Sequence, residues 1–323
     1  MEHRTVAAGP SSLTVLIGDV CNAKCTMCWQ DTRRAATPQS EWWPEMSAEM
    51  LTVALERFSS TLQGVEIVSF GEPMANPSFG AMLSEIRRRG LYVSMITNGS
   101  LLHRHVDDLA PVPGEATISV DAITPVLYER IREGLTLDRV VRNIDLLAHH
   151  PAKHAARRVG INMVVFEDNV HELSPMVDFC VDHGLDYLSI LHGAALEKTR
   201  AAGRELSRDD PRLLAGITYA KQQRRAGFLV NDYASPASPK HPCKLPWTHL
   251  DMDPRGEMHA CCRAYGESLG HYTDEVWRGT ELERLRAQIT AGAVDPDAFP
   301  SCSRCEYLGL PSPPRQHRLP VIQ

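Results

Sequence analysis

Three cysteines near the start of the chain have a spacing that could hold a metal cluster. Cys21, Cys25 and Cys28 are separated by three and two residues and follow an apolar run over residues 13–17. Three thiolates on one short loop can ligate three irons of a cubane iron–sulfur cluster, which leaves the fourth iron without a protein ligand. Zinc is the other interpretation, but zinc sites usually close with a fourth nearby Cys or His. The next histidine along the chain is His103.

This cysteine spacing resembles that of the radical S-adenosylmethionine (SAM) superfamily. The resemblance implies that the open iron binds the amino and carboxylate groups of SAM. It also implies that an electron from the reduced cluster cleaves SAM to methionine and a 5'-deoxyadenosyl radical, which abstracts a hydrogen atom from the substrate. The cofactor then carries the difficult chemistry and the protein positions it. Met27 and Trp29 flank Cys28, and under this resemblance they shield the cluster and face the adenine, unless they only pack the loop.

Polar residues also stand at the ends of three apolar segments that are typical of buried parallel strands. Residues 65–70 lead into a Gly-Glu-Pro tripeptide, residues 92–96 into Thr-Asn-Gly, and residues 116–121 end in polar side chains. Under the resemblance, the first tripeptide contacts the SAM amino group, the second motif contacts the ribose, and a downstream arginine suits the methionine carboxylate through its fork of donors. Ordinary turns, helix caps or surface positions are the alternative. The candidate SAM contacts are Met27, Gly71, Glu72, Pro73, Asn98, Ser119 and Arg132.

The elements that must position these residues alternate between strands and helices. Apolar runs predict six strands, at 13–17, 65–70, 92–96, 116–121, 159–165 and 187–191, with helical patterns between them. In barrels of this kind, catalytic groups collect at the carboxyl ends of the strands. The expected fold class is therefore α/β, with a partial (β/α)6 TIM barrel of radical SAM type that is open to substrate on one side.

A second group of cysteines follows a proline-rich segment at 235–242. Cys243, Cys261, Cys302 and Cys305 make a C-x12-G-x4-C pattern followed by C-x2-C, and a hairpin over residues 247–258 would bring the first two together. Zinc is again an alternative for four thiolates. The pattern resembles the auxiliary-cluster extension called SPASM, or its shorter "twitch" form. Because the later cysteines of a full seven-cysteine domain are lacking, the resemblance implies one auxiliary [4Fe–4S] cluster beside the SAM-binding one.

Cys262 stands next to a predicted ligand. In radical epimerases of this class, a non-ligating cysteine returns a hydrogen atom to the substrate, and the resemblance gives Cys262 this catalytic role. Paired cysteines also occur here with other outcomes, and the spacing does not decide which member of the pair binds iron.

Domain boundaries follow from the motifs and the linker. We expect five segments: an N-terminal tail at 1–11, the partial barrel at 12–196, a connecting segment and linker at 197–242, the SPASM or twitch domain at 243–310, and a C-terminal tail at 311–323.

Composition limits the classes of partner. The chain has 323 residues, 43% hydrophobic and 23% charged, with a formal net charge of −6, which is typical of a globular protein. The negative charge argues against a nucleic-acid partner and suits a cationic substrate. No apolar run approaches the ~18 residues of a membrane span, and no signal peptide is evident. We expect a cytoplasmic protein without a membrane partner, whose cysteines bind metal rather than form disulfides.

The substrate class is inferred from what the chain lacks. Only twenty residues precede Cys21, whereas peptide-modifying relatives usually carry a recognition domain there. The chain looks most similar to short two-cluster enzymes of aminoglycoside and aminocyclitol biosynthesis, supplied by a flavodoxin- or ferredoxin-type electron donor. We expect hydrogen abstraction at a carbinol carbon. Epimerisation follows if Cys262 returns a hydrogen atom, and two-electron oxidation to a ketone follows if the auxiliary cluster accepts an electron. Peptide maturation and a zinc-stapled binding protein are the alternatives.

Overall fold

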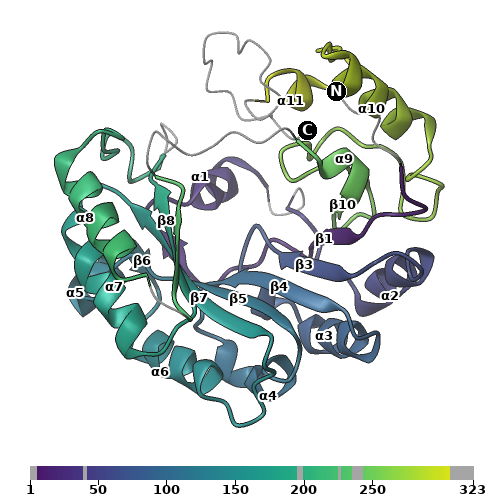
Figure 1. The fold of residues 1–323 in the computed structure, drawn as a ribbon. Helices are drawn as coiled ribbons and strands as arrows, with labels where there is room; N and C mark the ends of the chain where they lie inside the picture. Colours follow the sequence, from purple (N-terminus) through teal and green to yellow (C-terminus); the bar gives the residue numbers. More distant parts are fainter. Residues whose placement is uncertain (1–5, 39–41, 195–198, 225–226, 235–242, 306–323) are drawn as a thin grey trace. The chain divides into compact units, whose positions relative to one another are not determined.

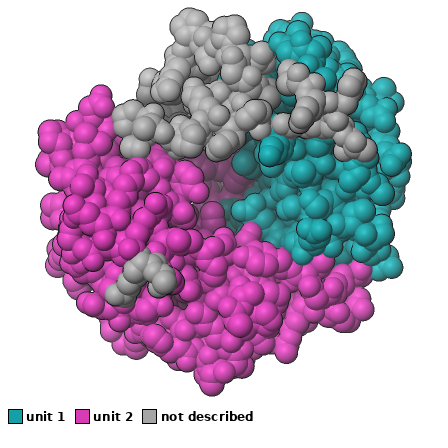
Figure 2. Space-filling model, viewed as in Figure 1, with its two compact units in different colours: residues 1–18, 43–69, 239–323 teal, residues 19–42, 70–238 magenta. Residues whose placement is uncertain are grey.

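A computed structural model describes residues 6–38, 42–194, 199–224, 227–234 and 243–305 (Figure 1). The chain forms two compact units, of residues 1–18, 43–69 and 239–323 and of residues 19–42 and 70–238 (Figure 2). The predicted linker at 235–242 and the C-terminal tail lie outside the described residues. None of the helices in the described part of the chain has the length and apolar character that a bilayer span requires.

The first unit is built on a four-stranded sheet. Its strands stand in the order β11 (Met258–His259), β10 (His249–Met252), β1 (Ser12–Leu16) and β3 (Gly64–Val68). β1 pairs in parallel with both β10 and β3, and β11 returns antiparallel to β10. The helices of this unit are α2 (Ala48–Arg57), α9 (Leu245–Thr248), α10 (Thr280–Ala291) and α11 (Pro300–Ser303).

Local sequence explains where α2 begins and which of its faces is buried. Ser47 caps α2, because its side chain accepts a hydrogen bond from the Met50 amide at 3.2 Å. Leu51 and Leu55, one turn apart, are fully buried, so the helix presents an apolar stripe to the core.

The second unit contains a parallel sheet of five strands. Their order is β4 (Tyr92–Thr97), β5 (Gly114–Ser119), β7 (Arg157–Val165), β8 (Tyr187–His192) and β9 (Leu229–Asp232). Figure 1 shows the longer run of helices of this unit, from α3 to α8, along one face of the sheet. These helices are α3 (Phe79–Arg88), α4 (Val106–Leu109), α5 (Pro125–Ile131), α6 (Leu137–Ala148), α7 (Leu173–Asp182) and α8 (Pro211–Gln222).

Smaller elements complete this unit. Helix α1 (Trp29–Ala36) follows the first three cysteines, and a short 3-10 helix, η2 (Pro73–Ala75), follows the Gly-Glu pair. Strands β2 (Lys24–Cys25) and β6 (Arg132–Glu133) form a separate antiparallel ribbon of two residues each. Arg132 begins β6 directly after the end of α5 at Ile131.

The predicted fold class is confirmed as mixed α/β with a parallel sheet. All six expected strands are present, as β1, β3, β4, β5, β7 and β8. Strand β9 was not predicted, since Leu229–Asp232 mixes apolar and polar residues in only four positions. The expected hairpin at 247–258 is confirmed in part. β10 and β11 pair antiparallel, but Trp247 and Thr248 belong to α9.

Candidate functional site

Cys21, Cys25 and Cys28 lie half-buried in the loop between Asp19 and α1. The loop turns back on itself, since the Cys28 amide donates to the Cys25 carbonyl at 3.1 Å. Burial raises the pKa of Cys21 to about 11 and also raises the pKa of Cys25. The Cys21 and Cys25 thiols therefore hold their protons at neutral pH, and metal binding would have to displace these protons.

Backbone contact with Gly71 fixes the start of this loop. The Glu72 amide donates to the Val20 carbonyl at 2.8 Å, and a Cβ atom placed on Gly71 would lie 1.9 Å from that carbonyl oxygen. The close approach explains why position 71 is a glycine.

Asn22 ties the loop to the end of β4. Its side chain donates to the Ser100 hydroxyl at 2.9 Å and accepts from the Asn98 amide group at 2.9 Å. Asn98 was predicted as a ribose contact, and in the structure its side chain contacts the cysteine loop. Asn22 was missed, because nothing in the cysteine spacing indicates which partner an intervening polar residue reaches.

The Glu72 carboxylate is buried and accepts hydrogen bonds from three groups. It accepts from the Thr97 hydroxyl at 2.6 Å, the Asn98 amide at 2.7 Å and the Met74 amide at 3.2 Å. Burial raises the pKa of Glu72, and these donors oppose the shift. The side chain joins η2 to the end of β4, while Pro73 begins η2. Contact of Gly71, Glu72 and Pro73 with SAM stays a prediction.

Arg132 is paired with Asp121 and lies against Cys25. Its Nε donates to Asp121 Oδ2 at 2.7 Å, and its Nη1 lies 3.8 Å from Cys25 Sγ. Burial alone would lower the pKa of Arg132, but the negative charge of Asp121 raises it overall. Two of its donors are therefore used within the protein. The predicted contact with the methionine carboxylate would then be made by Nη2, the remaining nitrogen of the guanidinium group.

A buried hydroxyl close to this group is unsatisfied. Within the described residues, the Tyr128 hydroxyl has no hydrogen-bond partner, and its electrostatic neighbours include Arg132, Asp121 and Cys25. A buried polar atom of this kind fits a bound group that can accept its hydrogen bond. Met27 and Ser119, the other predicted contacts, are half-buried at the cysteine loop and at the end of β5.

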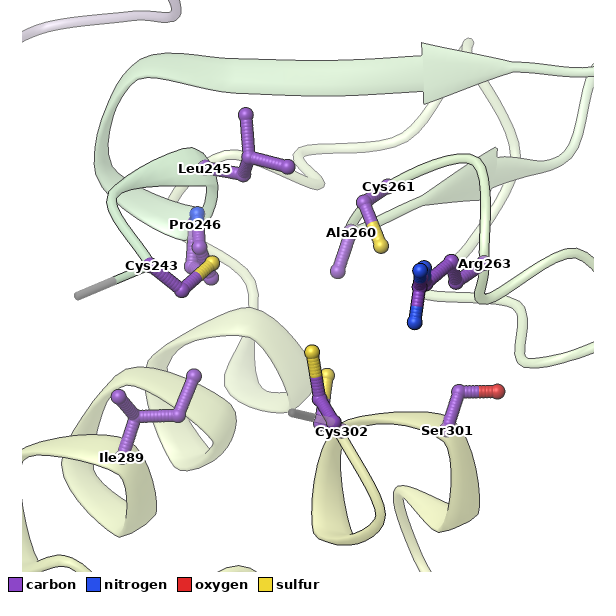
Figure 3. Close-up of a pocket in the computed structure, with 10 residues that line it drawn as sticks. Cys243, Leu245, Pro246, Ala260, Cys261, Arg263, Ile289, Ser301 and Cys302 are labelled. Carbon is purple, nitrogen blue, oxygen red and sulfur yellow. The ribbon is translucent and has the colours of Figure 1, made fainter. Parts of the chain in front are cut away.

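The second set of four cysteines surrounds one pocket. Cys243, Cys261, Cys302 and Cys305 all line it, together with Pro246 and Ala260 among others (Figure 3). Cys243 stands before α9, Cys261 follows β11 and Cys302 lies in α11. Burial raises the pKa of Cys302 to about 12 and raises the pKa of Cys261 further.

The donor sets fit iron–sulfur clusters by their chemistry. Thiolates are the preferred ligands of such clusters, and the structure collects three and four cysteines at the two places where the sequence predicted them. Across the part of the chain that the structure describes, no three Cys, His, Asp or Glu side chains are arranged to hold one metal ion. The fit therefore depends on donor type and not on preformed coordination geometry.

Cys262 does not line the four-cysteine pocket and is exposed. Partial desolvation and the negative charges of Asp251 and Glu66 raise its pKa, so the thiol keeps its hydrogen at neutral pH. These carboxylates lie on β10 and β3, the two strands that flank β1, and Thr14 of β1 is in register with both. The Thr14 hydroxyl donates to Glu66 at 2.9 Å and the Tyr265 hydroxyl donates to Asp251 at 3.1 Å.

Two family models match the chain. The radical SAM superfamily model matches residues 15–180, and the model of SPASM, an iron–sulfur cluster-binding domain, matches residues 243–306.

Relatives and solved structures add to these matches. A PqqA peptide cyclase of Streptomyces rochei is 25% identical over 292 residues, which cover 83% of this chain and 75% of that protein. A GTP 3',8-cyclase of Caulobacter vibrioides is 27% identical over 186 residues, and the match spans 54% of this chain and about half, 49%, of that enzyme. The crystal structure of Streptococcus suis SuiB bound to S-adenosylmethionine has a TM-score of 0.69 at 18% identity, covering 86% of this chain and 67% of SuiB. At that identity the likeness concerns the fold.

Proposed function

Because this chain belongs to the radical SAM superfamily and binds SAM and a [4Fe–4S] cluster, we propose that it uses radical chemistry to modify a peptide. Cys21, Cys25 and Cys28 would hold the SAM-binding cluster. The cysteines of the four-cysteine pocket would hold an auxiliary cluster in the SPASM domain.

The observation that carries the peptide proposal is the extent of one match. The similarity to the PqqA peptide cyclase extends over 83% of this chain and 75% of the relative, whereas the similarity to the GTP 3',8-cyclase covers about half of each protein. A further solved structure of SuiB, bound to precursor peptide SuiA, has the same fold with a TM-score of 0.66. The expectation of a small cationic substrate therefore becomes the second candidate.

The protein's own residues have defined tasks in this proposal. When bound and reduced by a flavodoxin- or ferredoxin-type donor, the first cluster supplies the electron that cleaves SAM. Gly71 allows close contact with the start of the cysteine loop at Val20, and Asn22 holds the loop against the end of β4. Glu72 joins η2 to the same end of β4. Positioning of this kind is what the protein contributes to cofactor chemistry.

Anaerobic turnover tests the proposal. The reconstituted enzyme is incubated with SAM, dithionite and either short peptides encoded beside its gene or a panel of aminoglycosides. We expect a peptide to accelerate formation of 5'-deoxyadenosine and to change mass, for example by a loss of two daltons on cross-linking. Cys25→Ala serves as the inactive control. Absence of 5'-deoxyadenosine under all conditions would contradict the radical mechanism, and acceleration by a sugar alone would contradict the peptide substrate.

Cys262 favours the second candidate, which is hydrogen abstraction from a carbinol carbon of an aminoglycoside or aminocyclitol. An exposed, protonated thiol outside the four-cysteine pocket could return a hydrogen atom to the substrate radical, and the external reductant with a proton would then restore the thiol. In D2O, epimerisation gives a product with one deuterium and otherwise unchanged mass. Oxidation to a ketone instead gives a loss of two daltons. Cys262→Ala should abolish the epimerised product while 5'-deoxyadenosine still forms.

A further inference from the structure

The ribbon of β2 and β6 places one cluster cysteine opposite an arginine. Its register pairs Cys25 with Arg132 and Lys24 with Glu133, and the Thr26 amide extends the pairing by donating to the Ile131 carbonyl at 2.9 Å. Backbone hydrogen bonds thus fix the relative position of these two residues, independently of their side chains.

The guanidinium of Arg132 is also fixed in orientation. Nε donates to Asp121 Oδ2 at 2.7 Å, and the other oxygen of Asp121 accepts from the Val164 amide at 2.9 Å. The Arg132 side chain is 10% exposed and that of Asp121 is fully buried. With Nε held by the carboxylate, Nη1 is directed at Cys25 Sγ, 3.8 Å away.

We propose that Arg132 raises the reduction potential of the SAM-binding cluster by donating a charge-assisted hydrogen bond to the sulfur of Cys25, while Asp121 holds the guanidinium in place. This inference rests on the proposed function, in which Cys25 is a cluster ligand. Reduction adds one electron to the cluster, and that negative charge is stabilised by a positive group beside a ligand sulfur in a site with little water. Arg132 is therefore a positioning and electrostatic residue, whatever its contact with SAM.

Asp121 moderates this effect. Its negative charge opposes that of Arg132, but it contacts Nε, whereas the cysteine sulfur faces Nη1. Removing Arg132 should therefore make the cluster harder to reduce, and neutralising Asp121 should make it easier. Opposite shifts from two residues of one ion pair are not expected from a general loss of structure.

The test is the midpoint potential of the reconstituted protein, measured by electron paramagnetic resonance without SAM. The relevant cluster is identified separately, as the one whose signal changes when SAM is added. For Arg132→Met we expect at least a tenfold fall in the ratio of reduced to oxidised cluster at a fixed potential. For a one-electron couple, a tenfold fall corresponds to a midpoint potential 59 mV lower. Asp121→Asn should shift the ratio upward. Arg130→Met, which removes an exposed positive charge at the end of α5, should leave it unchanged because water screens that charge.

A second comparison covers the case in which Arg132→Met leaves Asp121 unpaired and the protein misfolds. The double variant Arg132→Met/Asp121→Asn contains no uncompensated buried charge, so it is compared with Asp121→Asn alone. We expect the ratio of reduced to oxidised cluster to be tenfold lower in the double variant than in Asp121→Asn. Equal potentials in cluster-loaded samples would overturn the role of Arg132 and leave the proposed function intact. A wild-type protein in which no cluster signal responds to SAM would overturn the proposed function itself.

Discussion

Replacing Gly71 with alanine is expected to displace the cysteine loop. A Cβ atom at this position would lie 1.9 Å from the Val20 carbonyl oxygen, 2.4 Å from the Val20 carbonyl carbon and 2.9 Å from the Asp19 carbonyl carbon. All three are backbone atoms, so no change of side-chain rotamer relieves the clash. Either the loop that begins at Val20 or the turn that contains Glu72 must move.

The cost of accommodating the new methyl group has two parts. Overpacking against a rigid neighbour costs about 1–3 kcal/mol. Separation of the two segments also breaks the hydrogen bond from the Glu72 amide to Val20, whose net contribution is about 0.5–1.5 kcal/mol. The sum is about 1.5–4.5 kcal/mol, and at 1.4 kcal/mol per factor of ten, SAM affinity should fall roughly 12- to 1,600-fold.

Iron content and SAM binding together measure this effect. Reconstituted wild-type protein with two cubane clusters should hold about eight irons per chain, and Gly71→Ala should hold about four, because the four-cysteine pocket lies in the other compact unit. Equilibrium dialysis then gives the SAM affinity. Gly80→Ala in α3 is the matched control, since its new methyl would meet only the His105 ring at 3.7 Å and should stabilise the helix by about 0.5–1 kcal/mol.

The reasoning is refuted by one clear result. If Gly71→Ala takes up as much iron as the wild type and binds SAM with unchanged affinity, the backbone contact with Val20 does not determine where the cysteine loop lies.

Three further predictions concern other parts of the molecule. Cys302→Ala should lose about four of about eight irons, whereas Cys262→Ala should keep all of them. Iron and sulfide analysis measures both variants, and an equal loss of iron in the two would contradict this prediction. Asn22→Ala removes two hydrogen bonds of about 1 kcal/mol each, so SAM affinity should fall more than tenfold, and an unchanged affinity in equilibrium dialysis would contradict this. Hydrogen bonding to Arg88 and a second arginine lowers the pKa of Glu85 from 4.5 to about 2, so its stabilisation is fully present above pH 4.5 and is lost as the pH falls through about 2. Glu85→Gln should therefore cost about 0.5–1 kcal/mol at pH 7 and less as the pH approaches 2, and a pH-independent difference in urea unfolding would contradict this.

Much of the fold could be predicted from the sequence because its signals are local. Buried strands such as β1 and β8 are short runs rich in apolar residues, and the cysteine spacings specify donor sets within a few residues of each other. Strand β9 and the ribbon of β2 and β6 carry no such signal. Two-residue strands have no periodicity, and their pairing depends on contacts between segments about a hundred residues apart.

The candidate site was predictable as a set of residues but not as a set of partners. The sequence identified Asn98 and Arg132 as candidates for SAM contact, yet the partners that hold them, Asn22 and Asp121, are known only once the chain is folded. A polar residue in a sequence motif can serve a ligand, another side chain or both. Only the geometry distinguishes these roles.

Several predicted SAM contacts hold the cysteine loop in place before any cofactor is present. Gly71 touches Val20, Asn98 binds the side chain of Asn22, and Arg132 lies against Cys25. Substituting any of them is therefore expected to change the position of the cysteines as well as the surface offered to SAM. Loss of turnover in such a variant does not by itself assign a SAM contact. A variant that keeps its full iron content and loses SAM affinity has lost a contact with SAM. In a variant that loses both iron and SAM affinity, the cysteine loop is displaced.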